Sequence, residues 1–232
     1  MKKRIKKRVT KKTTYRLLSF DIGAKNFAFY IEQFKLSDLK ELEIPKVKMI
    51  KGKCSEEYKK FLEKVFKNGE RIILEVFDLR GKDEFLYDQD VLVNMYDVLD
   101  DYSELFDTCN GVIIEQQMQF FGRGNSARNI IAVKLAQHCH SYFIHKYRET
   151  IPVAEFPAFH KTQVLAAPLN LNKYHRKKWA VVQAKDILKM RKDEEGYRII
   201  SIIHGDKADD VSDVIVQAQA FKILAFIQRK WK

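Results

Sequence analysis

The feature that most constrains the fold is an aspartate inside an apolar strand near the start of the chain. Residues 16–23 read Arg-Leu-Leu-Ser-Phe-Asp-Ile-Gly, and a second apolar run, residues 26–31, follows after a short turn. These runs predict a hairpin of two buried strands. A lone buried carboxylate costs several kcal/mol unless it is paired, hydrogen-bonded or bound to a metal. Asp21 therefore needs a cation, unless it is a structural capping group.

The order of the remaining elements predicts one mixed sheet flanked by helices. Apolar residues at helical spacing predict a helix over residues 91–106, and the run Gly-Val-Ile-Ile-Glu at 111–115 predicts a short buried strand. Asn125 or Ser126 is the expected cap of a helix that ends near Tyr147. Further expected elements are strands at 45–51 and 151–154 and helices at 179–190 and 207–231. Residues 52–85 combine a charged, helix-like segment at 55–67 with an apolar run at 72–77. A hairpin followed by alternating helices and strands is typical of an α/β fold.

Composition sets the class of protein. The chain has 232 residues, of which 46% are hydrophobic, enough for one compact domain. No run of about 20 apolar residues or signal-like segment occurs, so we expect a soluble, intracellular protein with no membrane partner. Three cysteines without a CxxC pair indicate neither a disulfide framework nor a zinc ribbon, which fits a reducing compartment.

The net charge of +12 is unevenly distributed. Residues 1–16 carry nine Lys or Arg and no acid, residues 32–110 carry 13 basic and 19 acidic side chains, and residues 120–232 carry 20 basic and 10 acidic ones. Such an uneven distribution of charge is typical of a protein that binds a polyanion, here nucleic acid. We expect residues 1–14 to form a disordered basic tail that binds DNA, aids solubility or directs nuclear import.

Two further places carry acids of the same kind as Asp21. Glu115 ends an apolar strand, and Lys-Ala-Asp-Asp-Val-Ser-Asp at 207–213 opens the last helix. Asp210 and Asp213 are spaced i, i+3 and share a helix face, while Asp209 points about 100° away. Each motif alone also has a purely structural interpretation. Glu115 could be a capping carboxylate, and the acids at 207–213 could form a solvated first turn of the helix.

Together the acids indicate a metal-dependent nuclease. Mg²⁺ prefers oxygen ligands, and two ions about 4 Å apart activate water and stabilise a leaving oxygen in phosphodiester cleavage. An acid on the first strand, another on a central strand and a pair on the last helix are what two such ions need. We therefore expect two Mg²⁺ ions per site, replaceable by Mn²⁺, and no small-molecule cofactor.

The motifs also resemble those of poxvirus Holliday-junction resolvases, relatives of bacterial RuvC. The similar segments are residues 20–26, 113–117, 176–178 and 207–213. The resemblance implies an RNase H-like fold with a mixed five-stranded sheet, a homodimer, and symmetric paired cleavage of four-way DNA junctions. It implies catalytic acids and metal ligands at Asp21, Glu115, Asp210 and Asp213. It places an active-site lysine within residues 176–178, at Lys178 or alternatively Lys177.

The resemblance covers roughly residues 15–30 and 88–232. It implies one nuclease domain over residues 15–232, in which residues 52–85 look like a family-variable insertion. It also implies a viral protein acting at a replication site in the host cytoplasm, with the nucleus as an alternative because of the basic tail.

Several other residues are candidate DNA contacts. Lys25 and Asn26 lie next to Gly23, where backbone can approach a ligand closely. Phe120 and Phe121 could stack on bases, although core packing is the simpler interpretation. The remaining candidates are Arg123, Arg128, Arg176 and Lys177.

Competing functions fit less well. His138, Cys139, His140 and His145 do not share one helix face, so a metal site there is not indicated. Sugar-kinase-like ATPases need two duplicated domains, and DEDD exonucleases need an acid where this chain has Gly23. A related nuclease that prefers flaps, forks or RNA–DNA hybrids remains the alternative. The apolar face of the helix at 126–147 is the candidate dimer interface.

Overall fold

The computed structural model describes residues 14–80, 89–117, 126–148, 150–203 and 206–231. All of the predicted basic tail except Thr14 lies outside these residues. So do Phe120, Phe121 and Arg123.

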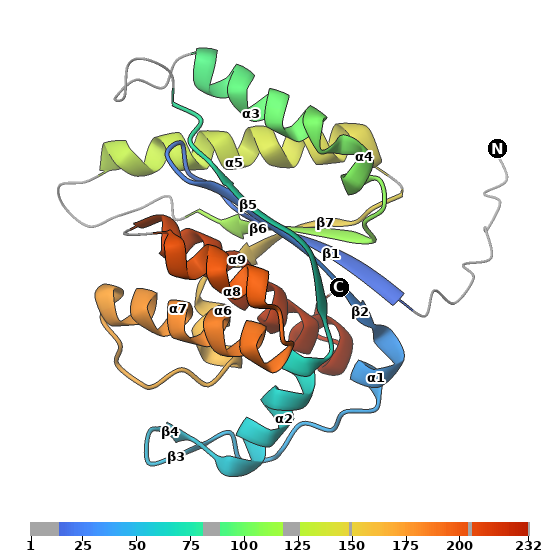
Figure 1. Ribbon diagram of the computed structural model, residues 1–232, viewed down its shortest axis with the longest axis vertical. Helices are drawn as coiled ribbons and strands as arrows, with labels where there is room; N and C mark the ends of the chain where they lie inside the picture. The colour runs from blue at the N-terminus through green and yellow to red at the C-terminus, as the bar shows by residue number, and fades with distance from the viewer. Residues whose placement is uncertain (1–13, 81–88, 118–125, 149, 204–205, 232) are drawn as a thin grey trace, which may run out of the picture.

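Five strands form one mixed sheet, in the order β5-β2-β1-β6-β7 (Figure 1). Their bounds are β1 (Thr14–Asp21), β2 (Phe27–Lys35), β5 (Glu70–Phe77), β6 (Gly111–Gln116) and β7 (Val153–Pro157). Strand β2 runs antiparallel to both β1 and β5, whereas β6 is parallel to β1 and β7 is parallel to β6. This strand order with one reversed strand is the RNase H-like sheet, and the predicted fold class is confirmed.

Helices cover both faces of the sheet (Figure 1). One face packs against α3 (Gln89–Asp101), α4 (Ser103–Phe106) and α5 (Ser126–Tyr147). The other packs against α2 (Glu56–Lys67), α6 (Phe159–Val164), α7 (Lys173–Met190), α8 (Glu194–Ile202) and α9 (Asp206–Lys222), which continues into a π-helical turn, Ile223–Ile227. The short elements are α1 (Leu36–Lys40), β3 (Met49–Ile50) and β4 (Lys53–Cys54).

The alternation of side chains along β1 divides the core into two layers. Leu18 and Phe20 face the α3–α5 layer, and the ring of Phe20 lies 5.4 Å from that of Phe143 on α5. Leu17 faces the other layer, so by the two-residue period Ser19 and Asp21 face it too. Full burial of each large apolar side chain contributes about 1.5–3 kcal/mol. The acid is thus directed toward α9 by the same alternation that builds the core.

The apolar face of α5 is used inside the molecule. Leu135, Cys139 and Phe143 are fully buried against the sheet. Ile130 and Ile144 are the large hydrophobic side chains that remain exposed on the described part of this helix. The face proposed as a dimer interface from the sequence therefore belongs to the protomer's own core.

Several predicted elements differ in extent. The helix expected at 91–106 is divided at Tyr102, and α7 begins six residues before the predicted start because the Asn172 side chain accepts a hydrogen bond from His175 N. The strand expected at 45–51 is reduced to β3, which pairs with β4 outside the main sheet. Helices α6 and α8 were not predicted.

The segment 52–85, expected to be a family-variable insertion, contains α2 and β5. Strand β5 pairs with β2 along seven residues and forms an edge of the main sheet. At least this part of the segment therefore belongs to the fold itself.

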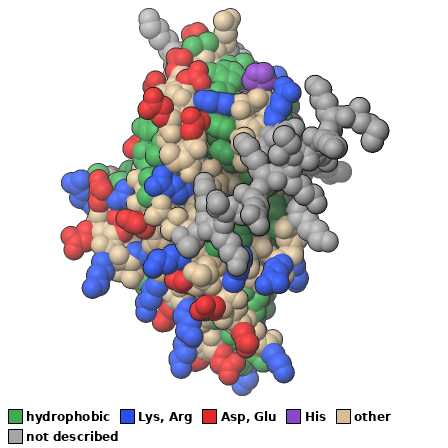
Figure 2. All heavy atoms as spheres, turned by 90° about the vertical axis from the view of Figure 1, so that its right-hand side faces the viewer, with side chains coloured by type: hydrophobic (Ala, Val, Ile, Leu, Met, Phe, Trp, Pro, Cys, Tyr) green, Lys and Arg blue, Asp and Glu red, His purple; other side chains and the backbone are tan. Residues whose placement is uncertain are grey.

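The described surface carries charge of both signs. In the view of Figure 2, acidic side chains gather near the top, where α3 and α4 lie, and lysines and arginines are more numerous below. The exposed acids of α3, α4 and the residue after them are Asp90, Asp97, Asp100, Asp101, Glu104 and Asp107. Within the described residues, no helix is both long and apolar enough to cross a membrane.

Candidate active site

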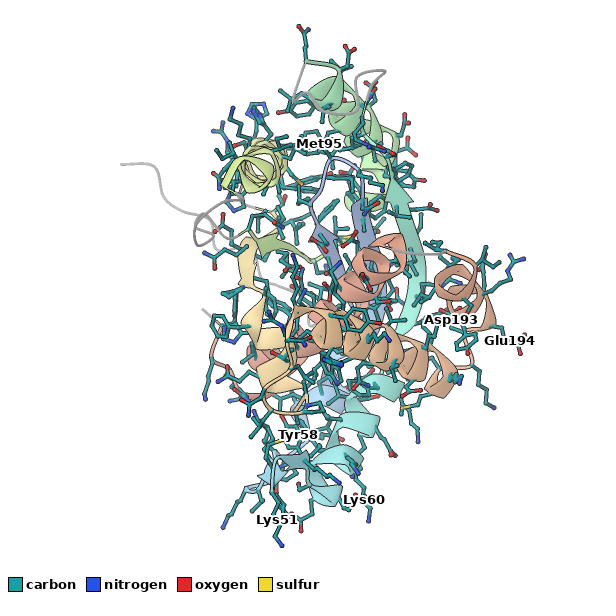
Figure 3. All side chains as sticks on the ribbon, turned by 90° about the vertical axis from the view of Figure 1, so that its left-hand side faces the viewer. Lys51, Tyr58, Lys60, Met95, Asp193 and Glu194 are labelled. Carbon is teal, nitrogen blue, oxygen red and sulfur yellow. The ribbon has the colours of Figure 1, made fainter. Side chains whose placement is uncertain are left out.

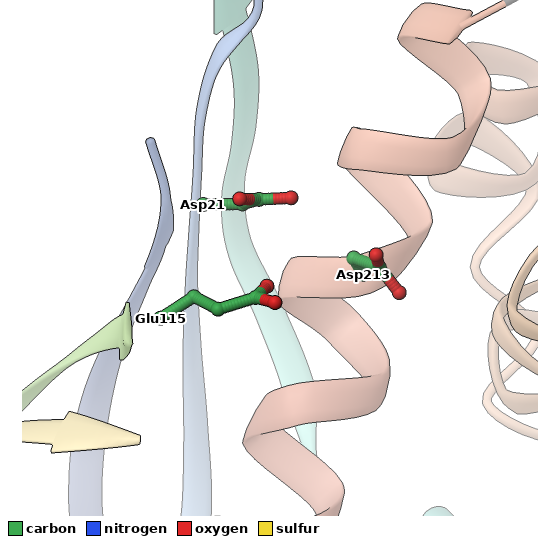
Figure 4. A group of neighbouring side chains, drawn as sticks. All are labelled: Asp21, Glu115 and Asp213. Carbon is green, nitrogen blue, oxygen red and sulfur yellow. The ribbon is translucent and has the colours of Figure 1, made fainter. Parts of the chain in front are cut away.

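The parallel pairing of β1 and β6 brings the first two acids together. Phe20 lies opposite Ile114 in this register, so the next residues, Asp21 and Glu115, lie at the carboxyl ends of adjacent strands. Ile113 belongs to the core layer that contains α9, and the two-residue period turns Glu115 to the same side. Both carboxylates therefore point to one face of the sheet, as Figure 4 shows.

Helix α9 supplies the third acid. Buried Gln217 anchors the helix to β1 by donating hydrogen bonds to Ser19 Oγ at 3.1 Å and to the Phe20 carbonyl at 3.2 Å. Asp213 lies about one turn before this anchor and faces the strand ends. One carboxylate oxygen each from Asp21, Glu115 and Asp213 lie within 4.8 Å of one another. The structure thus brings together three of the four predicted metal ligands.

The fourth acid, Asp210, lies beside this group and is held by the β1–β2 turn. Asn26 Nδ2 donates a hydrogen bond to Asp210 Oδ2 at 2.6 Å. The turn is tight at Gly23, where a Cβ atom would lie 3.2 Å from the carbonyl oxygen of Asn26. Asn26, expected from the sequence to contact DNA, thus orients a carboxylate in this structure. Lys25, in the same turn, is exposed to solvent.

A lysine that the sequence analysis did not select lies among the acids. Lys161 Nζ is 2.8 Å from Glu115 Oε2 and 3.2 Å from Asp213 Oδ2, and the residue is only 6% exposed. It is carried by α6, which follows β7, the strand that pairs with β6 around Glu115. The sequence signal for Lys161 is its position, four residues after the end of β7. This signal can be recognised only when the pairing of β7 with β6 is known.

The basic cluster at 176–178 lies on α7. The ammonium of Lys178, the favoured active-site lysine, is 4.4 Å from the centre of the Tyr174 ring, whereas the ammonium that contacts the acids is that of Lys161. Lys177 Nζ is 2.9 Å from Asp209 Oδ2. Arg176 and Lys177 line the cleft described below. The backbone of Arg128 is in α5, but its side chain lies outside the described residues.

Burial and mutual repulsion raise the pKa values of the clustered acids. Burial holds the pKa of Asp21 well above its usual range, and the charges of Glu115 and Asp210 raise it further. Burial likewise raises the pKa of Glu115, although Lys161 opposes the shift. The pKa of Asp210 is raised to about 6, mainly by burial. Burial and neighbouring like charges thus disfavour the ionised forms of these carboxylates in the absence of a bound cation.

The pKa of Lys161 moves in the opposite direction. Burial alone would lower it, but the carboxylates of Asp213, Glu115 and Asp21 outweigh burial and raise it. Lys161 therefore stays charged, and it is one cation among three clustered acids. Closely spaced carboxylate oxygens with excess charge are the donor set that hard divalent cations such as Mg²⁺ or Mn²⁺ prefer. The residues present fit a divalent metal centre.

A cleft of about 740 Å³ opens over the acids. Glu115, Lys161 and Asp213 contribute to its lining together with three basic residues at the start of α7, Lys173, Arg176 and Lys177. Phe159, which is 60% exposed, also lines it. The arrangement joins an acidic floor, which fits a divalent cation, to a basic wall, which is suited to a phosphate-containing substrate.

Relatives of known sequence come from iridescent viruses. Uncharacterized protein 170L of Invertebrate iridescent virus 6 is 28% identical over 243 aligned positions, which cover 92% of this chain and 91% of the relative. Uncharacterized protein 97L of Invertebrate iridescent virus 3 is 27% identical over 133 positions, covering 57% and 58% of the two chains. No family model matches the chain.

Solved structures with the same fold are Holliday-junction resolvases. The yeast mitochondrial resolvase Ydc2 superposes with a TM-score of 0.59 at 14% identity, covering 93% of this chain and 81% of Ydc2. The fowlpox virus resolvase in complex with Holliday-junction DNA gives a TM-score of 0.52 at 14% identity, covering 89% and 96%. At this level of identity the likeness establishes the shared RNase H-like fold.

Proposed function

We propose that this chain is a divalent-metal-dependent endonuclease that resolves four-way and other branched DNA junctions. The observation that carries the proposal is the convergence of Asp21, Glu115 and Asp213 on a buried, incompletely neutralised site beneath a basic cleft. Support for the substrate comes from the fold, which the chain shares with the fowlpox and yeast mitochondrial Holliday-junction resolvases. The positive charge of the chain supports a nucleic-acid partner.

The metal ligands in this proposal are Asp21, Glu115, Asp210 and Asp213. Bound Mg²⁺ or Mn²⁺, two ions per site, would activate water and stabilise the leaving oxygen of the cleaved phosphodiester. Asn26 fixes the Asp210 carboxylate before any ion binds. Such preorganisation lowers the cost of ordering ligands around the substrate.

Lys161 is the active-site lysine in this proposal. Its ammonium contacts two of the acids and is fully charged, so it can stabilise negative charge that develops on the cleaved phosphate. Lys173, Arg176 and Lys177 on the cleft wall would neutralise DNA phosphates. Lys178, the residue favoured from the sequence, would then act at most as a phosphate contact.

We further propose that the protein acts as a homodimer of viral origin. A Holliday junction has two equivalent strands related by a two-fold axis, and paired incision needs two active sites. The relatives from iridescent viruses support the viral origin and a site of action within infected cells. A homodimer predicts a mass of about twice 27.4 kDa by light scattering without DNA.

The test is cleavage of a labelled mobile four-way junction, a flap, a linear duplex and an RNA–DNA hybrid, each with Mg²⁺, Mn²⁺ or EDTA. We expect metal-dependent, symmetrically paired cuts in the junction. The Asp21→Asn, Glu115→Gln, Asp210→Asn and Asp213→Asn variants should each bind the junction and cut it at least about 1,000-fold more slowly, a loss of about 4 kcal/mol.

The outcomes separate the alternatives. Preference for the flap or the hybrid would keep the nuclease and replace the resolvase. Normal cleavage by both the Asp21→Asn and Asp213→Asn variants would contradict the site. Release of singly nicked product by a monomer would contradict symmetric resolution, even if cleavage depends on the metal.

A further inference from the structure

The small hairpin formed by β3 and β4 carries an isolated concentration of positive charge. Residues 45–55 contain four lysines and no acid, although the surrounding stretch, residues 32–110, is acidic overall. Lys46, Lys51 and Lys53 are exposed, and Lys48 is partly buried. Among the described residues, none of the four has a carboxylate oxygen within 4.0 Å of its ammonium. The charge of the three exposed lysines, Lys46, Lys51 and Lys53, is therefore not neutralised by an acid of the described chain.

The geometry of the turn holds this charge outward. Register pairs Met49 with Cys54 and Ile50 with Lys53, which leaves Lys51 and Gly52 as a two-residue turn. Both have positive φ, 47° and 77°, as the tight hairpin turn that matches strand twist requires. Lys51 consequently lies at the lower tip of the molecule, below Tyr58, in Figure 3.

The hairpin is fixed to the helix that carries Lys161. Tyr58, just after the hairpin, donates a hydrogen bond from its hydroxyl to the Val164 carbonyl at 2.8 Å, and Lys48 Nζ donates to the Gln163 carbonyl. Ser55 closes the base of the hairpin by donating from Oγ to the Val47 carbonyl at 2.6 Å. The lysines therefore have a defined position relative to the acids.

Two neighbouring hollows lie between the hairpin and the active site. A second cavity of about 360 Å³ is lined by Lys48 and Met49 of the hairpin and by the loop after α6. Thr162 and Arg176 line both this cavity and the larger cleft over the acids. Burial lowers the pKa of Lys48, and the positive charge of nearby Lys230 lowers it further. Lys48 and Arg176 thus place a positive charge at the hairpin and at the boundary between the two hollows.

We propose that the β3–β4 hairpin binds the phosphate backbone of a duplex arm that leaves the active-site cleft. This inference rests on the proposed function and assigns to it a surface outside the active site. A regular duplex carries closely spaced phosphates, which match exposed lysines on a fixed support. An acidic protein would also be attracted to these lysines, but its binding would not depend on the position of the hairpin beside the active-site cleft.

The experiment compares two triple variants with the same loss of charge. The hairpin variant replaces Lys46, Lys51 and Lys53 by Gln. The control replaces Lys40, Lys64 and Lys67 by Gln, which are also exposed. The control lysines belong to α1 and the end of α2, which adjoin the ends of β2 and β5 away from Asp21. Both are made in the Asp21→Asn background, so that junction binding is measured without cleavage.

The readout is the affinity for a four-way junction as a function of salt concentration. Removing one lysine–phosphate interaction lowers the slope of log K against log salt by about one, so we expect a fall of roughly one to three for the hairpin variant. Its affinity for a long-armed junction should fall about tenfold or more. The control should keep the wild-type slope, and a junction with shortened arms should not distinguish the two variants.

Each other outcome contradicts the proposal. Equal slopes for the two variants would show that the hairpin acts only through net charge. The same conclusion would follow if the hairpin variant lost as much affinity with short arms as with long arms. A change of oligomeric mass in the hairpin variant alone would assign the surface to a second copy of the chain. Circular dichroism checks the fold, and the single Lys51→Glu variant at the exposed turn repeats the test. Junction cleavage by the otherwise wild-type protein separates failure of this inference from failure of the proposed function.

Discussion

Two buried charge clusters lie on the same face of the sheet and have opposite balances. In the first, Glu32 on β2 is completely buried and pairs with Arg191 at 2.7 Å and Lys222 at 3.0 Å. In the second, three acids share Lys161. Although burial opposes it, the two cations lower the pKa of Glu32 to about 2, whereas the pKa values of Asp21 and Glu115 are raised.

This difference in charge balance distinguishes a cluster that is compensated within the protein from the cluster that we propose to bind metal. Glu32 Oε2 also accepts hydrogen bonds from Gln219 at 2.8 Å and from the Tyr30 hydroxyl at 2.9 Å, so the carboxylate is well compensated by the protein. The acids at the strand ends carry more charge than their surroundings neutralise. Such sites cost stability and persist where an external cation or substrate uses them.

The sharpest comparison substitutes the same residue type in both clusters. Glu32→Gln leaves Arg191 and Lys222 buried without their counter-charge and should lower the free energy of unfolding by about 3–5 kcal/mol. Glu115→Gln leaves Lys161 paired with Asp213 and should change it by less than about 1 kcal/mol without metal, because repulsion is also relieved. Urea unfolding in EDTA measures both. A larger loss for Glu115→Gln would mean that the site acids, too, are structural.

The next comparison concerns the lysines. Lys161→Gln should lower the cleavage rate about 100- to 1,000-fold, the usual effect of removing one electrostatic contact to a transition state. Lys178→Gln should change the rate by less than about threefold, because its ammonium lies over the Tyr174 ring. Single-turnover cleavage of a four-way junction measures both. The reverse order of effects would restore the lysine favoured by the sequence.

The pH dependence of stability should also differ between the clusters. The pKa of Asp210 is about 6 in the folded protein, above its unfolded value, so the folded state takes up protons and gains stability as pH falls from about 7 to 5. The gain is on the order of 1–3 kcal/mol. Glu32 has a lowered pKa, so its contribution is fully present above its unfolded pKa and is lost as pH falls toward 2.

Thermal unfolding in EDTA between pH 7.5 and 5 tests the Asp210 effect, with Asp210→Asn as the control. The stability difference between wild type and this variant should move in favour of wild type as pH falls. A difference that is constant over this range would contradict the assigned origin of the shift. Saturating Mg²⁺ should reduce the dependence, because it stabilises the charged carboxylates.

The acids were predictable from the sequence because each violates a local rule. Asp21 and Glu115 interrupt or end apolar strands, and these violations are visible without knowing the fold. Lys161 violates nothing locally, since a lysine on a short helix is ordinary; only the pairing of β7 with β6 places it at the site. Glu32 was missed for a related reason, because its partners are 159 and 190 residues away along the chain.

The sheet was predicted better than its helices because strand alternation is fixed by burial on each face. Phe20 and Asp21 had to lie on opposite sides whatever the topology. The apolar face of α5 packs in the core of the chain, and its role in a dimer stays a prediction, because an amphipathic helix indicates that an apolar partner exists but not whether that partner is the same chain. The break between α3 and α4 at Tyr102 could not be predicted either, because the helical spacing of apolar residues continues across it.

Asp209 is intermediate between the fully compensated Glu32 and the clustered acids, and only a small effect is expected there. Its carboxylate forms a partly exposed ion pair with Lys177, with the side chains 18% and 34% exposed, and such pairs contribute about 0–1 kcal/mol. Asp209→Asn should therefore reduce junction cleavage by less than about fivefold, whereas Asp210→Asn, one residue further on, should nearly abolish it. If the pair only positions Lys177 on the cleft wall, Lys177→Gln should show a similar loss and the double variant should be no worse than either alone. A loss at Asp209 as large as that at Asp210 would instead place a fifth carboxylate in the metal centre and remove the distinction between neutralised and unneutralised acids.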